Sequence, residues 1–367
     1  MRILQGLKVV EFEGLGPGPF CGMLFADLGA DVTLIARSHA APSGPGAVVN
    51  RGKRSIVLDL KKPSHVDAAA RIAAAADATI EGLRPGVMER LGLGPDILRA
   101  ANRRLVYGRL TGWGQNGPLS AMAGHDINYV ATSGAGWYAG ATGERPTPAP
   151  TLVGDVAGGA LYLAIGVLAA VLRARETGEG AVVDAAIVDG SAHMMNLLLT
   201  LRAAGGLPDE RGNSMLDGAH FYGVYRCADG GHISVGPLEP KFYSIFLERL
   251  GLNQETEFIA QYEAANWPAC AARLQSIFAT KPRDEWAALF DGSDACVAPV
   301  LSPTEAARRP HMAVRRVYRE IDGVLHAAAA PRFNGAIPAD PLPCKPIGSE
   351  AAEILAEVGL SAEDLDA

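Results

Sequence analysis

The sequence opens with a hydrophobic strand, a glycine turn, a helix and a second strand in close succession. The segments are LKVVEFE at 7–13, GLGPGP at 14–19, FCGMLFADLGAD at 20–31 and VTLIAR at 32–37. A second unit of the same kind has SIVLDL at 55–60, a helix from Ser64 and ATIEGL at 78–83. Strands that alternate with helices over short connections predict a parallel sheet covered by helices. The predicted fold class is therefore α/β.

The pattern changes after residue 200, which predicts a second, smaller α+β domain. A polar, glycine-rich linker at 201–224 is followed by a β-hairpin pattern around Asp229–Gly231. Further helical stretches and the strand CVAPVL at 296–301 complete this domain, which we place at 225–310. A second linker at 311–330 then leads to 331–367, which completes the large domain formed by 1–200.

Composition restricts the compartment and the partners. A formal net charge of -7 gives no electrostatic reason to expect nucleic acid. The 5 cysteines have no C-x-x-C spacing, which argues against a disulfide framework or a zinc site and favours a reducing, cytoplasmic location. The N-terminus has no signal-peptide pattern. The apolar run from Val156 to Leu172 is predicted to be a buried core helix and not a membrane span.

Two features near the start could bind phosphate. Gly14, Gly16 and Gly18 lie between a strand and a helix, but their spacing differs from the G-x-G-x-x-G dinucleotide fingerprint, so a tight turn that starts the helix is the simpler interpretation. The segment 37–62 is basic, although Asp59 lies within it, and a basic segment either binds a nucleotide with several phosphates or forms a solvated face. Its basic residues are Arg37, Arg51, Lys53, Arg54, Lys61 and Lys62.

Three titratable residues are candidates for acid–base chemistry. His125 lies in the small-residue segment AGHDINY, and a histidine exchanges protons near neutrality. Asp155 stands at the head of the apolar helix, where it could cap the helix or lie beside free backbone N–H groups that stabilise an oxyanion. Glu239 lies between two prolines after the predicted hairpin. Taken singly, each also has a purely structural explanation.

Nine strings along the chain carry a resemblance to a known family. They are NRGKRSIVLDLK, RPGVMERLG, TGWGQNGP, AGHDINY, LVGD, VVDAAIVDG, NSMLDGAHFYGVYRCADG, VGPLEPKFY and SDACVAPVL. Together they resemble the α-methylacyl-CoA racemases of the class III CoA-transferase (CaiB/BaiF-like) superfamily. The resemblance implies a Rossmann-like large domain and an inserted small domain. It also implies an interlocked homodimer whose active sites lie between the large domain of one chain and the small domain of the other.

The resemblance assigns roles to particular residues. His125 and Asp155 match the two catalytic proton carriers, and Glu239 matches a glutamate that supports the site, in its own chain or across the dimer. The residues that match positions in contact with coenzyme A are Arg37, Leu58, Asp59, Leu60, Lys61, Arg84, Gly124, His125, Asp126, Ile127, Asn128 and Tyr129. This sequence departs from the family pattern at His220, where a proline is more usual, and at Ala36 and Ser38, which flank Arg37.

The implied reaction interconverts (2R)- and (2S)-2-methylacyl-CoA thioesters through an enolate. His125 and Asp155 would act on opposite faces of the α-carbon, and backbone N–H groups at the start of the Asp155 helix would stabilise the oxyanion. No metal or redox cofactor is required, because coenzyme A is part of the substrate. The rival hypotheses are a class III CoA transferase with Asp155 as nucleophile, an NADP-dependent oxidoreductase and a non-catalytic CoA-binding subunit. The sequence leaves the acyl chain open.

Overall fold

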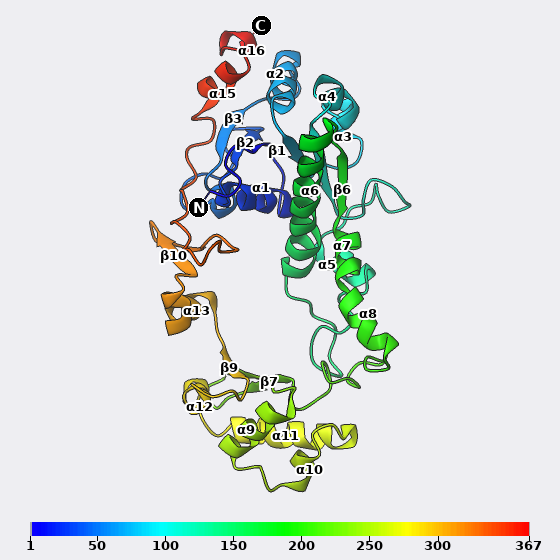
Figure 1. Ribbon diagram of the computed structural model, residues 1–367, viewed down its shortest axis with the longest axis vertical. Helices are drawn as coiled ribbons and strands as arrows, with labels where there is room; N and C mark the ends of the chain where they lie inside the picture. Colours follow the sequence, from blue (N-terminus) through cyan, green and yellow to red (C-terminus); the bar gives the residue numbers. More distant parts are fainter. Residues whose placement is uncertain (1, 367) are drawn as a thin grey trace. The chain divides into compact units, whose positions relative to one another are not determined.

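The computed structural model describes residues 2–366 and divides them into two compact units (Figure 1). Unit 1 contains residues 2–135, 149–194 and 307–366, and unit 2 contains Gly136–Pro148 and Met195–Ala306. Residues 136–148 therefore group with unit 2, although the sequence-based boundaries place them in the large domain. The reason is a set of hydrogen bonds, because the Arg211 guanidinium donates to the carbonyls of Ala139, Ala141 and Glu144.

Unit 1 is built on a parallel sheet of six strands in the order β3-β2-β1-β4-β5-β6. The strands are β1 (Lys8–Phe12), β2 (Asp31–Ala36), β3 (Arg54–Val57), β4 (Ala78–Glu81), β5 (Val106–Thr111) and β6 (Val182–Ala186). The connecting segments are α1 (Pro17–Asp27), η1 (Val48–Asn50), α2 (Pro63–Ala74), α3 (Val87–Arg90), α4 (Pro95–Ala101), α5 (Asp126–Thr132), η2 (Leu152–Ala160) and α6 (Leu161–Thr177). Helix α7 (Ile187–Met194) follows β6. The order reverses between β1 and β4, where open α/β sheets bind ligands.

Each strand contributes to two apolar cores, because successive side chains point to opposite faces of the sheet. On one face, Val9 of β1 packs in a cluster with residues of α1 and α6. On the other face, Val10 belongs to a cluster that includes residues of α2 and α4. Helices therefore cover both faces, as the alternating pattern predicts.

One helix of the described chain is long and apolar enough to cross a membrane by length and composition. It runs from Leu152 to Thr177 through η2 and α6, with 26 residues and a mean hydropathy of 2.0 in its most apolar window. Leu163 and Val167 are fully buried and α6 packs against β5 and β6, whereas Ile165 and Leu172 are each 64% exposed. The prediction of a buried core helix is thus right for one face of the helix and wrong for the other.

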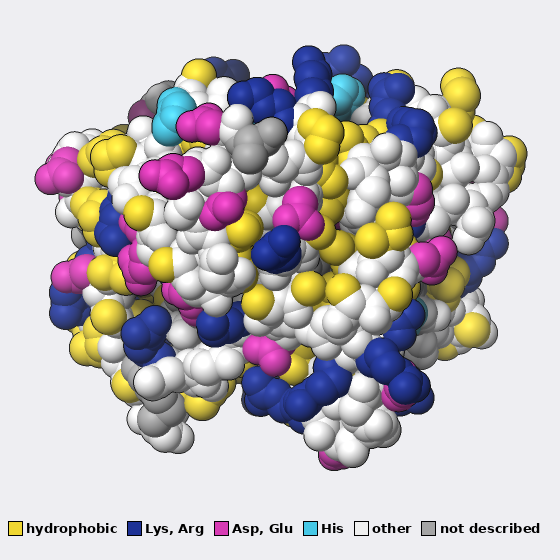
Figure 2. Space-filling model, turned by 90° about the horizontal axis from the view of Figure 1, so that it is seen from above, with side chains coloured by type: hydrophobic (Ala, Val, Ile, Leu, Met, Phe, Trp, Pro, Cys, Tyr) yellow, Lys and Arg dark blue, Asp and Glu magenta, His cyan; other side chains and the backbone are white. Residues whose placement is uncertain are grey.

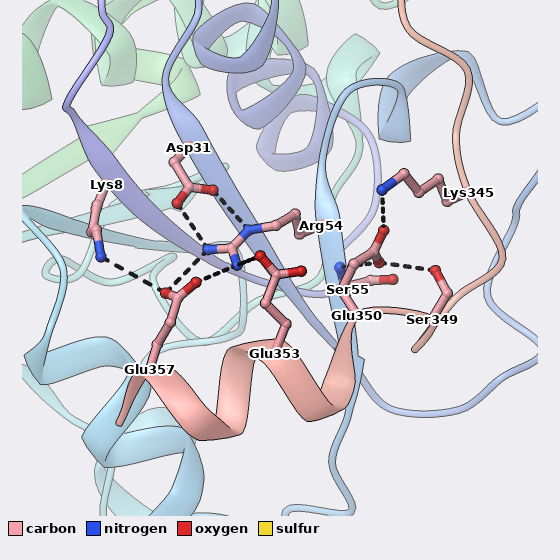
Figure 3. A network of polar contacts seen from close by, with 9 residues as sticks. All are labelled: Lys8, Asp31, Arg54, Ser55, Lys345, Ser349, Glu350, Glu353 and Glu357. Atoms are coloured by element: carbon pink, nitrogen blue, oxygen red, sulfur yellow. Dashed lines mark hydrogen bonds and ion pairs between the residues drawn. The ribbon is translucent and has the colours of Figure 1, made fainter. Parts of the chain in front are cut away.

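The C-terminal segment is attached to the N-terminal strands by a polar network (Figure 3). Arg54 on β3 donates to Asp31 on β2 at 2.9 Å and to Glu357 of α15 (Ala351–Glu357) at 2.6 Å. Nearby, the Ser55 backbone N–H donates to the Glu350 carboxylate at 3.2 Å. Ile354 and Leu355 of α15 are buried in the core that also contains residues of α2. Helix α16 (Glu363–Asp366) also packs against α2. The last residues thus complete unit 1.

The segment 307–330 has more structure than the linker that the sequence predicts at 311–330. It contains α14 (Pro310–Val314) and an antiparallel hairpin of β10 (Tyr318–Ile321) and β11 (Val324–Ala327). The turn between these strands is Asp322–Gly323, and both residues have positive φ. Asp-Gly is a strong signal for such a turn, so this hairpin could have been found from the sequence.

Unit 2 contains a three-stranded antiparallel sheet and short helices around an aromatic core. Strands β7 (Gly223–Arg226) and β8 (His232–Val235) form the predicted hairpin, and β9 (Val297–Val300) pairs with β8. The helical segments are α8 (Asn196–Ala203), α9 (Pro240–Leu250), α10 (Thr256–Ile259), η3 (Ala264–Asn266), α11 (Trp267–Phe278) and α12 (Arg283–Phe290). Helix α13 (Pro303–Arg308) lies at the boundary with unit 1.

His220 is buried in this aromatic core, with only 1% of its surface exposed. Its Nε2 lies 2.6 Å from the hydroxyl of Tyr243, and its ring contacts the edges or faces of Phe221 and Phe258. Burial lowers the pKa of His220 to about 4, so the folded unit holds it neutral. The histidine is therefore part of the core of unit 2.

This burial predicts that acid destabilises unit 2. An unfolded histidine titrates near 6.5, so the unfolded chain binds the proton first as the pH falls. The contribution of His220 to the free energy of unfolding should be constant above pH ~6.5 and should fall by about 3 kcal/mol as the pH drops towards 4. Urea titrations followed by tryptophan fluorescence measure this, because Trp137, Trp267 and Trp286 all lie in unit 2. His220→Phe should remove the contribution of His220 to the pH dependence of the free energy of unfolding. The control His232→Gln, at an exposed histidine, should retain it. If the free energy of unfolding changed equally with pH in both variants, the prediction would be contradicted.

Candidate active site

A cavity of about 470 Å³ opens at the carboxyl ends of β1, β4 and β5 in unit 1. Its wall includes the turn Leu15–Gly18 after β1, the turn Gly82–Pro85 after β4 and Thr111–Trp113 at the end of β5. His125 and Asp155 both line it. The cavity therefore lies at the point where the strand order reverses, and both predicted proton carriers line it.

Asp155 lies in the first turn of η2, a π-helical segment. In a π-helix, backbone hydrogen bonds join residues five positions apart. The Val156 N–H donates to the carbonyl of Thr151, and Thr151 has a left-handed backbone with φ of 59°. Non-glycine residues adopt this conformation at a cost, and such strain is common at functional sites. The wider π-helical turn thus fixes where the Asp155 side chain enters the cavity.

The surroundings of Asp155 favour its protonated form. Burial, and then the charge of Asp126, raise the pKa of the Asp155 carboxyl, while His125 lowers it less. Gly16, in the turn after β1, has φ of 64° and passes so close that a Cβ there would lie 3.4 Å from Asp155 Oδ2. The glycine turn therefore brings backbone to the carboxyl group, in addition to starting α1.

The start of η2 is a poorer source of oxyanion donors than the sequence suggests. The N–H of Thr151 and that of Asp155 both donate to Asp126, and the N–H of Leu152 donates to Pro150. The N–H of Val156 is also engaged. The predicted oxyanion contact at this helix start is therefore restricted to the N–H groups of Val153 and Gly154, and it stays a prediction.

His125 is exposed and precedes α5 in extended backbone conformation. Its backbone N–H donates to Asn128 Oδ1 at 3.0 Å, which fixes the entry into the helix. Tyr129, one turn later, donates to the carbonyl of Gly124 and packs edge-on against Trp113. These contacts hold the imidazole at the mouth of the cavity while leaving its ring accessible.

The residues predicted to contact coenzyme A fall into separate groups. Arg84, Gly124, Asp126 and Tyr129 line the cavity together with His125, but the Asp126 carboxylate is directed at backbone N–H groups. Leu60 and Lys61 border a more open depression beside α2. The remaining predicted residues, which lie outside both linings, are Arg37, Leu58, Asp59, Ile127 and Asn128.

Several of these side chains have other tasks in the fold. Leu58 is fully buried in the core, so only its backbone is available to a ligand. Asp59 accepts a hydrogen bond from the Lys61 backbone, and Asn128 caps α5. Ile127 is 61% exposed, and Arg37 is exposed and paired with Glu13 through its backbone N–H and Nε.

Half of the predicted basic cluster is bound inside unit 1. Arg51 pairs with Asp27 at 2.5 Å, Lys53 pairs with Glu11 at 2.6 Å, and Arg54 forms the network of Figure 3. On the face shown in Figure 2, lysines and arginines form separate groups with acidic side chains between them. The six basic residues thus do not form one phosphate-binding site. Only Arg37, Lys61 and Lys62 remain available to a ligand.

Glu239 is exposed in unit 2, where it precedes α9 in extended conformation. Burial, and then the charge of Glu239, raise the pKa of Cys296 in the same unit. His125 and Asp155 belong to unit 1. The structure therefore brings the first two predicted catalytic residues together and places the third in the other unit. Among residues 2–366, no group of three His, Cys, Asp or Glu side chains could hold a metal ion.

Comparisons with known proteins agree with this arrangement. Residues 4–348 match CoA-transferase family III. The chain belongs to this family. It is 39% identical to the alpha-methylacyl-CoA racemase of Mus musculus over 366 residues and 40% identical to that of Homo sapiens over 378 residues. Both alignments cover 99% of this chain and 95% of the relative.

Two solved structures have a similar fold. A CAIB/BAIF family protein from Brucella suis matches with a TM-score of 0.82 at 25% identity, covering 97% of this chain and 99% of that one. Rv3272 from M. tuberculosis matches with a TM-score of 0.77 at 26% identity, covering 96% and 99% of the two chains. The mixed α/β architecture with its parallel sheet is thus that of the family.

Sequence reasoning missed much of the cavity wall. Leu15, Gly82, Thr111, Trp113 and Thr151 line the cavity, although none of them was predicted as a site residue. Their common feature is that they follow strands or precede helices at one edge of the sheet. Only the strand order shows which of these loops meet, so the glycine-rich TGWGQNGP after β5 was the single local signal.

Proposed function

We propose that this chain is a racemase that interconverts (2R)- and (2S)-2-methylacyl-CoA thioesters by moving the α-proton. The observation that carries the proposal is the shared cavity, which holds both a histidine and a carboxyl group whose pKa is raised by burial. Identity near 40% to two alpha-methylacyl-CoA racemases over almost the full length supports the same conclusion.

The reaction needs one base and one acid on opposite faces of the substrate. A thioester acidifies its α-carbon because the enolate places negative charge on the thioester oxygen. His125 supplies an imidazole that can accept a proton, and the raised pKa of Asp155 increases the fraction of its carboxyl group able to donate one. Reversing the two roles reverses the direction of the reaction. No cofactor enters this scheme, since coenzyme A belongs to the substrate.

A CoA transferase is the second candidate, because Asp155 also has the position of a nucleophile. Relatives in CoA-transferase family III include an Acetyl-CoA:oxalate CoA-transferase from Acetobacter aceti, 29% identical over 349 residues. A carboxylate nucleophile would attack the thioester carbonyl and form an anhydride with release of CoA thiolate. That chemistry uses the ionised form of Asp155, and burial raises the pKa of this carboxyl group.

Solvent deuterium separates the two candidates. A single epimer of a 2-methylacyl-CoA is incubated with the protein in D₂O, without any acceptor acid. A racemase incorporates deuterium at the α-carbon and equilibrates the two epimers. Recovery of the original epimer without deuterium would refute the racemase assignment.

We also propose that Arg37 binds the 3′-phosphate of coenzyme A. Arg37 is exposed where β2 ends, on the same edge of the sheet as the cavity. Arg37→Ala should raise the KM for acyl-CoA by about 10- to 100-fold, as expected for a lost charge-assisted bond. The KM for the 3′-dephospho thioester should change much less. Arg71→Ala, which removes an exposed arginine of α2 paired with Asp67, serves as control; equal effects of Arg37→Ala on both thioesters would contradict the assignment.

The expected partner is a second copy of this chain. The outward face of α6 carries exposed apolar side chains, Ile165 and Leu172, and the edge strand β6 exposes Val182. Such surface is unfavourable in water and supports a homodimer. The strand order supports the Rossmann-like description of unit 1. A cytoplasmic location and the absence of membrane or nucleic-acid partners stay predictions from composition.

A further inference from the structure

We infer that Asp126 is a positioning residue, whose carboxylate holds the π-helical turn that presents Asp155 to the substrate. The inference rests on the proposed proton transfer through Asp155 and assigns Asp126 a task other than contact with coenzyme A. It follows from hydrogen bonds, burial and one glycine, all within unit 1.

The Asp126 carboxylate bridges both ends of the first turn of η2. Its Oδ2 accepts the Thr151 N–H at 3.1 Å, and its Oδ1 accepts the Asp155 N–H at 2.8 Å. Thr151 precedes η2 and has the strained left-handed backbone, and Asp155 carries the reacting carboxyl group. One side chain from α5 thus satisfies two N–H groups that the helix start would otherwise leave unpaired.

The contact is buried and closely packed. Asp126 is 9% exposed, so its charge is largely removed from water and depends on these two donors. Gly154 lies against it, because a Cβ at that position would come within 2.4 Å of Asp126 Oδ1 and 2.8 Å of a Val130 methyl group. The glycine in the string LVGD therefore allows α5 and η2 to approach closely enough for the bonds to form.

Two acceptor oxygens are needed, and only a carboxylate supplies them. Asparagine would keep one oxygen and turn an NH₂ group towards the second N–H, so one of the two bonds would be lost. The same two hydrogen bonds tie the start of α5 to the first turn of η2. His125 is held separately, through the bond from its backbone N–H to Asn128, so the loss of the Asp126 contact should act on Asp155 alone.

The experiment compares α-proton exchange in D₂O for each epimer separately, in wild type and in Asp126→Asn. Asp155→Asn and His125→Ala serve as references, because each should abolish exchange of one epimer. Asp126→Asn should reproduce the epimer preference of Asp155→Asn with a loss of about 10-fold or more, because the reacting carboxyl group would no longer be held in position. The KM for acyl-CoA should stay within about twofold, since the bond is not to the substrate.

Gly154→Ala tests the same contact from the other side and should show the same epimer preference. Asp77→Asn is the matched control, because Asp77 also accepts a backbone N–H, from Lys8, at the opposite edge of the sheet; both epimers should exchange normally. Any of three results would overturn the inference. Asp126→Asn and Gly154→Ala could lose exchange equally for both epimers, or they could show the epimer preference of His125→Ala. They could also exchange both epimers normally with a raised KM for acyl-CoA. A wild-type protein without any exchange would instead refute the proposed function.

Discussion

Asp155→Asn should lower the rate of epimerisation by about 10²–10⁴-fold, the contribution typical of a general acid or base. Asparagine keeps the size of the side chain and removes its transferable proton, so the cavity and the fold should persist. The rate is measured by following the ratio of epimers from a pure 2-methylacyl-CoA. Exchange at the face served by His125 should survive, because that imidazole does not depend on the lost carboxyl group.

The same position distinguishes proton transfer from covalent catalysis. During turnover of the wild type, hydroxylamine or borohydride should trap no adduct on the peptide that contains LVGD, as judged by mass spectrometry. A modified Asp155 would instead establish an acyl intermediate and a transferase. Near-normal epimerisation by Asp155→Asn would remove this carboxyl group from either mechanism.

His125→Ala should reduce epimerisation by a similar factor, about 10²–10⁴-fold, while CoA binding stays nearly intact. The imidazole is exposed at the cavity mouth and the helix cap is made by Asn128 and backbone, so its removal should cost little stability. Exchange and binding are measured on the same preparation, binding by calorimetry with CoA.

The matched control for this variant is His311→Ala. His311 is exposed on α14, in unit 1 but outside the cavity wall. We expect wild-type kinetics from it. If His125→Ala turned over like the control, the histidine would have no place in the proton transfer.

The local elements could be predicted because their signals are local. Apolar runs predicted four of the six parallel strands, at 7–13, 32–37, 55–60 and 78–83, and Gly16 marked the start of α1 correctly, although its proximity to Asp155 could not be seen. The π-helical form of η2 was missed, because it depends on the Asp126 carboxylate, which lies 29 positions earlier than Asp155. A tertiary contact of this kind leaves no periodicity in the sequence.

Charge patterns were less informative than strand patterns. Lys53 stands among basic residues in the sequence, yet it is buried with Glu11 of β1 and donates to the Pro19 carbonyl at 3.0 Å. The strand β3 brings its flanking cations next to acids of β1, β2 and α1, and only the three-dimensional pairing shows which charges remain for a ligand. Arg37 and Lys61 are examples that stay accessible.

The attachment of α15 to β3 also bears on how the chain folds as it leaves the ribosome. Ile354 and Leu355 cover an apolar face of α2 and the sheet, and Glu357 neutralises Arg54, although these partners are separated by 303 positions in the chain. Translation proceeds at about 5–20 residues per second, so this face and the Arg54 side chain stay uncovered for about 15–60 s. During that interval unit 2 is complete before unit 1. A nascent-chain chaperone would therefore have the most to protect on the earliest-made strands, and loss of the final helices would leave unit 1 in that unfinished state permanently.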